Sequence, residues 1–180
     1  MRHFFTRQTP SFTRVLLIES GSRRLFDTFI PSLYQFYGDQ LEIDLVTCFA
    51  GAPEGFRGKV YRIGDYPGRA GRKRLYAELN AYGYPIIGMI CSGETIMTKW
   101  KWALAAQVSA KIFALNENGD YFWVDWAHWR IMLHFALYRA GLTGAAAIPT
   151  IARLLFFPVT LSYLLAYAGF VHLRRKLRRT

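Results

Sequence analysis

RVLLIESGS, residues 14–22, is the stretch that decides the fold, because an apolar run leads directly into a Ser-Gly-Ser turn. A short apolar run bounded by small turn residues is typical of a buried strand. Residues 24–37 then repeat apolar side chains at helical spacing, although Pro31 lies inside the pattern. Together these residues predict a strand, a tight turn and a helix.

The same alternation continues along the chain as far as residue 115. Further strands are expected at residues 41–49, 59–63, 85–91 and 111–115, and further helices at residues 72–82 and 95–107. Short, nearly all-apolar strands that alternate with helices indicate a parallel sheet covered on both faces. We therefore predict a Rossmann-like α/β half-domain over residues 1–125, a length that suits one small domain. Residues 116–120 (NENGD) are expected to form a turn after its last strand.

Residues 126–180 differ in composition from the residues before them. They contain eight Arg or Lys and no Asp or Glu, and so contribute +8 to the net charge of +11. Residues 1–125 contain 15 basic and 12 acidic residues and contribute only +3. Because the excess charge belongs to an apolar, aromatic tail, it favours anionic phospholipid over nucleic acid as the partner.

An uncharged run of 20 residues, 154–173, lies at the centre of this tail and is followed by a basic cluster. About 20 apolar residues are enough to cross the bilayer core as a helix. Residues 129–138 are expected to form a shorter helix, with tryptophans such as Trp126 and Trp129 at headgroup depth. We therefore predict an amphipathic and membrane-inserted helical tail over residues 126–180. The basic residues expected to contact anionic lipid are Arg174, Arg175 and Lys176.

Three arrangements of this tail in the membrane are open. A tail anchor carries the terminal cations across the bilayer, against the positive-inside tendency. The inverted orientation exports the α/β domain without a visible signal. A monotopic insertion enters one leaflet and returns, with Pro149 and Pro158 as bend points, and we favour it. A buried helix of a larger soluble assembly is least favoured, because a wholly apolar helix that ends in cations is unusual in a core.

The cysteines and histidines indicate no metal site. Cys48 and Cys91 fit neither a metal-ligand spacing nor a disulfide framework, and the four histidines are scattered. We therefore expect no metal and no other cofactor. Unpaired cysteines are typical of a reducing compartment, and residues 1–14 lack the apolar core of a cleavable signal. The sequence thus predicts a location on the cytoplasmic face of the inner (plasma) membrane.

Polar residues follow the first and the fourth expected strands, whose ends build one crevice in a sheet of this kind. Free amides and hydroxyls there suit a phosphate or a sugar hydroxyl, whereas a tight turn with helix caps is the alternative interpretation. Glu19 and Glu94 are the candidate catalytic acid and base, with a first-turn carboxylate as the alternative for Glu94. The candidate ligand-binding residues are Ser20, Gly21, Ser22, Ser92, Gly93 and Asn116.

Basic residues gather at the start of the helix expected at residues 72–82. Cations there oppose the helix macrodipole, which favours a bound anion such as a lipid headgroup or a phosphorylated sugar. A solvated basic face is the alternative. The residues concerned are Arg72, Lys73 and Arg74. Residues 99–102 (KWKW), in the next helix, are interpreted as a mixture of core and surface positions.

The α/β part resembles the N-terminal half of GT-B glycosyltransferases of the ADP-heptose:lipopolysaccharide heptosyltransferase type. The resemblance rests on RVLLIESGS (14–22), IPSL (30–33), LEIDLVT (41–47) and RLYAELNAYGYPIIGMICSG (74–93). It implies a GT-B half-domain with a sugar-related crevice. The family carries an Asp, as catalytic base, in a Gly-Asp pair after the Ser-rich turn. The matching position here is Leu25, and Asp27 lies two residues later.

The second half of that family, which binds the nucleotide-sugar donor, is replaced here by the tail. The sequence therefore predicts a membrane-associated, glycosyltransferase-like protein of bacterial envelope polysaccharide or lipid-linked glycan synthesis. Such a protein is a degenerate acceptor-side domain or one part of a two-chain enzyme. Its expected partners are the anionic membrane, a sugar or lipid-linked glycan ligand and a partner transferase chain, with no nucleic acid. The alternative is a non-enzymatic membrane adaptor that recruits an enzyme.

Overall fold

The computed structural model describes residues 3–5, 10, 13–38, 40–116, 120–144 and 147–177. The chain divides into two compact units, Met1–Ile131 and Met132–Thr180, and each is described by itself. The first unit includes Trp126–His128 because the backbone N–H of Trp126 donates to the carbonyl of Phe4 (2.9 Å). Of the predicted NENGD turn, residues 117–119 lie outside the described residues.

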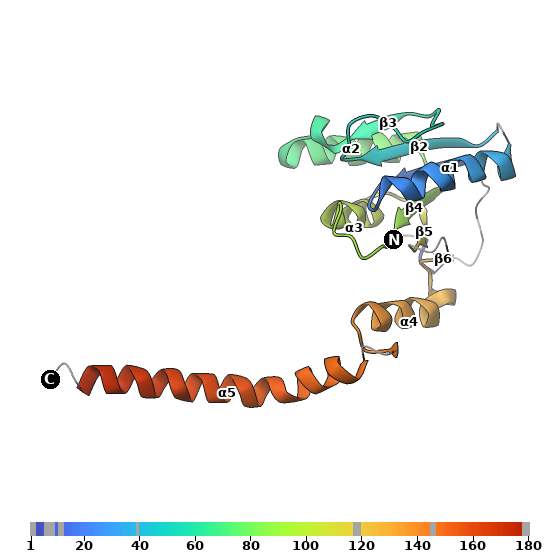
Figure 1. The fold of residues 1–180 in the computed structure, drawn as a ribbon. Coiled ribbons are helices and arrows are strands. Elements are labelled where there is room, and N and C mark those ends of the chain that lie inside the picture. Colours follow the sequence, from blue (N-terminus) through green and yellow to red (C-terminus); the bar gives the residue numbers. More distant parts are fainter. Residues whose placement is uncertain are drawn as a thin grey trace. The chain divides into compact units, whose positions relative to one another are not determined.

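A six-stranded sheet forms the centre of the first unit (Figure 1). Its strands, from one edge to the other, follow the order β3-β2-β1-β4-β5-β6. The strands are β1 Arg14–Ile18, β2 Glu42–Thr47, β3 Val60–Arg62, β4 Ile86–Ile90, β5 Lys111–Leu115 and β6 Tyr121–Trp123. The helices are α1 Arg23–Tyr37, α2 Gly68–Tyr82, α3 Thr98–Gln107 and α4 Trp129–Arg139, with 3₁₀ turns at Ile63–Asp65 and Trp126–His128.

The predicted α/β class is confirmed, but the prediction of a purely parallel sheet is wrong. β1 to β5 pair in parallel, whereas β6 runs antiparallel to β5, with Tyr121 opposite Leu115. Asn116 explains the reversal: its side-chain oxygen accepts from the backbone N–H of Asp120 (2.9 Å). So short a connection permits only an antiparallel return, because a parallel pair needs a crossover. At three residues, β6 is too short to show strand periodicity.

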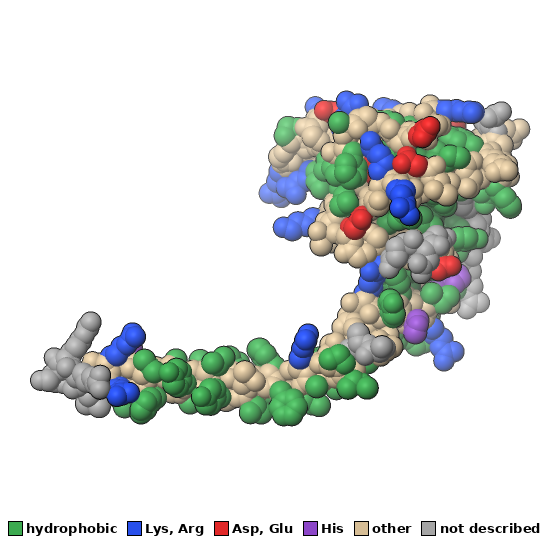
Figure 2. Space-filling model, viewed as in Figure 1, with side chains coloured by type: hydrophobic (Ala, Val, Ile, Leu, Met, Phe, Trp, Pro, Cys, Tyr) green, Lys and Arg blue, Asp and Glu red, His purple; other side chains and the backbone are tan. Residues whose placement is uncertain are grey.

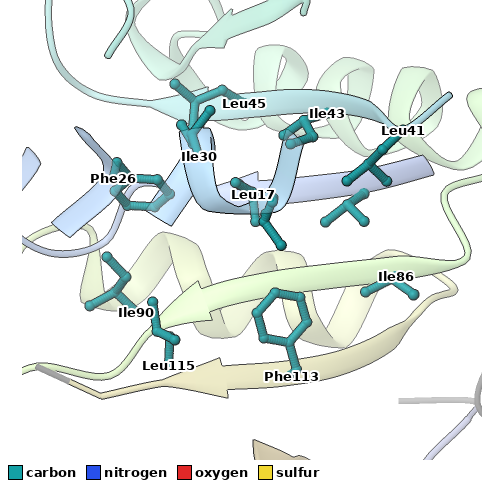
Figure 3. Close-up of a cluster of buried hydrophobic side chains, with 12 residues drawn as sticks. Leu17, Phe26, Ile30, Leu41, Ile43, Leu45, Ile86, Ile90, Phe113 and Leu115 are labelled. Atoms are coloured by element: carbon teal, nitrogen blue, oxygen red, sulfur yellow. The ribbon is translucent and has the colours of Figure 1, made fainter. Parts of the chain in front are cut away.

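The main core lies between α1 and one face of the sheet. Phe26, Ile30 and Leu33 of α1 are buried against alternate residues of β1, β2, β4 and β5 (Figure 3). α2 and α3 cover the opposite face, seen behind the strands in Figure 3. These two helices contact each other, since the side-chain amide of Asn80 donates to the carbonyl of Gln107 (3.0 Å). The sheet is therefore covered on both faces, as predicted.

The second unit contains α5, Ala147–Leu177, a helix of 31 residues. Its most apolar window has a mean hydropathy of 1.8, and none of that window is buried within the chain. Figure 2 shows hydrophobic side chains along its length, with basic side chains near its two ends. Pro158 lies inside the helix, which continues through it without a break. The long apolar helix expected in the tail is therefore present, with no interruption at Pro158.

Candidate functional site

The strand order changes direction between β1 and β4, and ligands of open α/β sheets bind at such a point, outside the carboxyl ends of the strands; this end of β1 and β4 is the site of the predicted crevice. The β1–α1 turn and the β4–α3 loop contact each other there. A Cβ atom at Gly21 would lie 2.5 Å from Ile90 Cγ2 and 3.0 Å from Ser92 Oγ. Only glycine permits this approach, so the structure brings the Ser-Gly-Ser turn against Ser92.

Serine hydroxyls in both loops are not used as helix caps. Ser22 stands at the N-cap of α1 without a side-chain capping hydrogen bond, and the N-cap of α3 is Met97 rather than Ser92. The alternative interpretation, in which these serine hydroxyls cap the two helices, is therefore wrong. Met97 has a φ of 51°, a left-handed conformation that costs a non-glycine residue free energy. The β4–α3 loop thus holds a strained backbone beside the crevice.

Lys101 is the residue at this site that the sequence interpretation missed. It is only 5% exposed, and its Nζ donates to the carbonyl of Ile90 (3.0 Å). The hydroxyl of Ser20 donates to the same carbonyl (2.8 Å). Among the residues that the structure describes, no carboxylate forms an ion pair with Lys101. A buried ammonium without a counter-charge is rare, since burial strips it of water.

The hydroxyl of Ser92 is a second polar group without a partner. Its Oγ is buried and makes no hydrogen bond to any described residue. Buried polar atoms are nearly always satisfied, so an orphan at the carboxyl end of β4 indicates a missing partner. Both Ser92 and Lys101 can donate a hydrogen bond, and both lie beside the carboxyl end of β4. Together they suit a ligand that accepts hydrogen bonds and carries negative charge.

Glu19 is held inside the domain rather than offered to a ligand. It is 0% exposed, and its carboxylate accepts from Arg23 Nε (2.8 Å) and Nη2 (3.2 Å). The Thr47 hydroxyl also donates to it. Because the Glu19 hydrogen bond stabilises the charged guanidinium, it raises the pKa of Arg23. This geometry gives Glu19 a structural role that joins β1, α1 and β2.

Neither Glu94 nor Asn116 contacts Glu19 among the described residues. Glu94 is exposed in the β4–α3 loop, and Gly93 beside it is exposed as well. The Asn116 side-chain amide donates to the Asp120 carboxylate (3.0 Å), so Asn116 closes the β5–β6 connection. No contact joins Glu19 to Glu94 among the described residues, which leaves the expected acid–base pair without geometric support.

The basic residues of α2 lie deeper in the helix than expected, because α2 begins at Gly68. Gly71 permits this early start, since a Cβ there would lie 2.4 Å from the Tyr66 carbonyl carbon. Arg74 Nη2 donates to the Asp65 carbonyl (2.9 Å), and the Arg72 Nε donates to the Gly68 carbonyl (3.3 Å). The side chains of Arg72, Lys73 and Arg74 remain exposed.

The other predicted contacts lie in the second unit. The exposed residues Arg174, Arg175 and Lys176 occupy the last turn of α5, where cations interact favourably with the helix dipole. In the described part of the chain, no group of three or more His, Cys, Asp or Glu gathers to hold a metal ion. Comparison with protein-family models, curated proteins and solved structures found no match to the chain.

Proposed function

We propose that this protein is a membrane-anchored, Rossmann-like domain of glycosyltransferase type that binds a phosphorylated sugar in bacterial envelope glycan synthesis. The single observation that carries the proposal concerns two buried groups at the carboxyl end of β4. Among the described residues, Lys101 forms no ion pair with a carboxylate and the hydroxyl of Ser92 has no hydrogen-bond partner. The reversal of strand order at β1 and β4 supports the Rossmann-like assignment, because dinucleotide and phosphate ligands bind at such points.

Membrane anchoring is supported by the surface of α5. Large apolar side chains are exposed around the whole helix, including Leu154 (62%), Phe157 (63%) and Leu165 (65%). A helix that is apolar on all sides is stable only inside a large core or a bilayer. The uncharged stretch between Arg153 and Arg174 spans about 30 Å, which matches the hydrocarbon thickness.

The unbroken course of α5 supports a single crossing of the bilayer rather than the monotopic insertion favoured by the sequence interpretation. A return within one leaflet requires an interruption, and α5 has none at Pro158. Cys48 is an exposed free thiol, which supports a cytoplasmic position for the α/β domain.

A ligand-binding role is better supported than catalysis by this chain alone. Glu19 is neutralised by Arg23, and Glu94 is exposed and makes no contact with Glu19 among the described residues. A transfer step needs an acid and a base within reach of the reacting atoms. We therefore propose that the chain holds the acceptor side of the reaction, and that a partner chain supplies the donor site and the catalytic groups.

Phosphate binding by full-length protein in nanodiscs tests this function. We expect inorganic phosphate and hexose or heptose phosphates to raise the unfolding midpoint of the wild type. Lys101→Met should abolish that shift because it removes the charge, and it should not lower the midpoint without ligand, since replacing a buried charge by an apolar side chain is often neutral or stabilising. Lys99→Met, an exposed position in the same helix turn, should retain the ligand shift. A shift that survives Lys101→Met contradicts the proposal.

A specific observation favours the adaptor as a second candidate. An open hollow of about 470 Å³ lies between α1 and the β5–β6 edge. It is lined mainly by aromatic side chains, of which Phe36 is 82% and Tyr121 is 69% exposed. Contiguous apolar surface of this kind is typical of protein interfaces. If the protein is an adaptor, a partner protein should co-purify with the wild type from detergent-solubilised membranes. Phe36→Ser should abolish this co-purification, whereas phosphate binding should stay unchanged.

A further inference from the structure

Four aromatic side chains form a cluster on the first unit, which we call the aromatic cluster: Phe4, Phe5, Trp126 and Trp129. Trp126 is its centre, with ring centroids 6.4 Å from Phe4, 6.3 Å from Phe5 and 6.4 Å from Trp129. The backbone hydrogen bond from Trp126 N to Phe4 O (2.9 Å) ties the two chain segments together. The fold therefore brings together residues that are more than a hundred positions apart in the sequence.

Most of the aromatic cluster faces solvent. Phe5 is 78%, Trp126 58% and Trp129 45% exposed. Apolar area left in water costs roughly 25 cal/mol per Å² relative to burial. Several large rings held together on a surface therefore indicate a contact with a partner rather than chance exposure.

A buried ion pair and hydrogen bonds hold the residue that precedes Trp126 in the aromatic cluster. Asp125, which precedes Trp126, is 2% exposed and forms an ion pair with the buried Lys111 (3.1 Å). The Asp125 carboxylate also accepts from the backbone N–H of His128 (3.1 Å) and contacts His128 Nδ1 (2.6 Å). Because Lys111 is the first residue of β5, these contacts place Trp126 at the edge of the sheet where the parallel strands begin.

The crevice lies at the opposite edge of the sheet, where β1 and β4 end. A five-residue strand separates the two edges by about 16 Å at the usual rise per residue. The start of α2, with Arg72, Lys73 and Arg74, follows the end of β3 and so belongs to the edge with the crevice. Only one of these edges can rest on a flat surface at a time.

Charge and chemistry select the partner of the aromatic cluster. From Trp126 onward the chain has no acidic residue, and Arg130 directly follows the cluster in α4. Tryptophan rings are favoured at the headgroup level of bilayers, and nearby cations favour anionic lipid. α5, the candidate membrane helix, begins 18 residues after Trp129. A peptide or soluble protein partner would not need this combination.

We propose that the aromatic cluster docks the α/β domain on the headgroup region of an anionic bilayer, with the crevice directed away from the lipid. This rests on the membrane anchoring proposed above. This docking implies that the ligand of the crevice is a water-soluble phosphorylated sugar. The headgroups of the leaflet on which the domain rests lie at the opposite edge of the sheet and do not reach the crevice. The docking also removes Arg72, Lys73 and Arg74 from contact with that leaflet.

Fluorescent labels at the two edges of the sheet test the docking in full-length protein reconstituted into vesicles with anionic lipid. One label is attached to the native exposed thiol of Cys48, which follows β2 at the crevice edge. The other is attached to the thiol introduced by His3→Cys in a Cys48→Ser background, which keeps all four rings. His3 is exposed beside Phe4. The quencher is a lipid spin-labelled at its headgroup.

We expect the label at position 3 to be quenched roughly twofold or more above the label at Cys48, since only the first edge lies at headgroup depth. Adding Phe5→Ser and Trp126→Ser to the His3→Cys protein should remove the difference. Equal quenching at both edges, or stronger quenching at Cys48, overturns the docking.

Alkaline carbonate extraction of the same vesicles separates the two proposals. Retained protein with equal quenching contradicts the docking while leaving the anchor by α5 intact. Protein released by carbonate contradicts the anchor and, with it, the docking.

Discussion

Gly88 lies at the centre of β4, where the ring of Phe113 crosses the strand. A Cβ there would lie 2.3 Å from Phe113 Cζ and 2.7 Å from Leu17 Cδ2. Gly88→Ala should therefore lower the free energy of unfolding by about 1–3 kcal/mol through overpacking. Urea unfolding in detergent measures this loss of stability. Gly64→Ala is the control, because no atom of the described residues lies within 4 Å of a Cβ at Gly64. A Gly88→Ala protein as stable as the control contradicts the packing.

The Asp125 carboxylate makes the stability of the folded domain depend on pH in the acidic range. Burial opposes its charge, but hydrogen bonds from His128 and Lys111 outweigh burial and lower the pKa of Asp125. The unfolded chain therefore binds this proton at higher pH than the folded one, so the stabilisation is complete above about pH 4 and is lost as pH falls through the lowered pKa.

Asp125→Asn should remove that acid dependence and also destabilise the domain at pH 7 by about 3–5 kcal/mol, since it breaks the buried ion pair between the Asp125 carboxylate and Lys111. Urea midpoints at pH 3 to 7 measure both effects. Glu54→Gln, at an exposed carboxylate in the β2–β3 connection, serves as the control and should leave both properties nearly unchanged. An unchanged acid dependence in Asp125→Asn would show that another group carries it.

At the scale of the element, α5 combines length with an apolar surface on all sides. Leu164 lies near the middle of the uncharged stretch and is 54% exposed. A charge there costs about 2.5–3.5 kcal/mol on insertion scales, so Leu164→Arg should reduce the fraction of protein that resists carbonate extraction. Leu164→Val should retain the wild-type fraction. Equal retention of the arginine variant would place α5 outside the bilayer core.

The spacing of apolar residues in the sequence predicted the helices and strands that are long enough to show a regular pattern. β5 has the predicted bounds, and α1 differs from the prediction by one residue. β6 escaped prediction because its position is set by the turn at Asn116 and by pairing with β5. The early start of α2 escaped because it depends on the close approach of Gly71 to Tyr66.

At the scale of the whole molecule, a single crossing by α5 places the two ends of that helix on opposite sides of the bilayer. Cys48 is a natural reporter for the α/β domain, and Thr180→Cys introduces a second thiol. In sealed vesicles, a membrane-impermeant maleimide should label the two thiols from opposite sides. Cys48→Ser identifies the new signal, and permeabilised vesicles give its full extent. Labelling of both thiols from one side would indicate the monotopic insertion.

Composition and periodicity by themselves determined the α/β class, the long apolar helix and its basic flank, because these depend on local patterns of burial and charge. The Ser-Gly-Ser turn and Ser92 were also predictable as neighbours, since both follow strands of one parallel sheet. Helical spacing offered a signal for Lys101 as well: it shares a face of α3 with the buried Leu104 and Ala105.

Only the tertiary structure decided which polar groups are satisfied. Glu19 resembled a free acid in the sequence, yet Arg23 and Thr47 occupy its carboxylate. Lys101 belonged to a stretch interpreted as a mixture of core and surface positions, and only the structure shows that it is buried with no carboxylate partner among the described residues. The meeting of Phe4 with Trp126 was equally hidden. Such outcomes depend on contacts between distant segments, and local sequence patterns hold no information about the partner that a side chain meets.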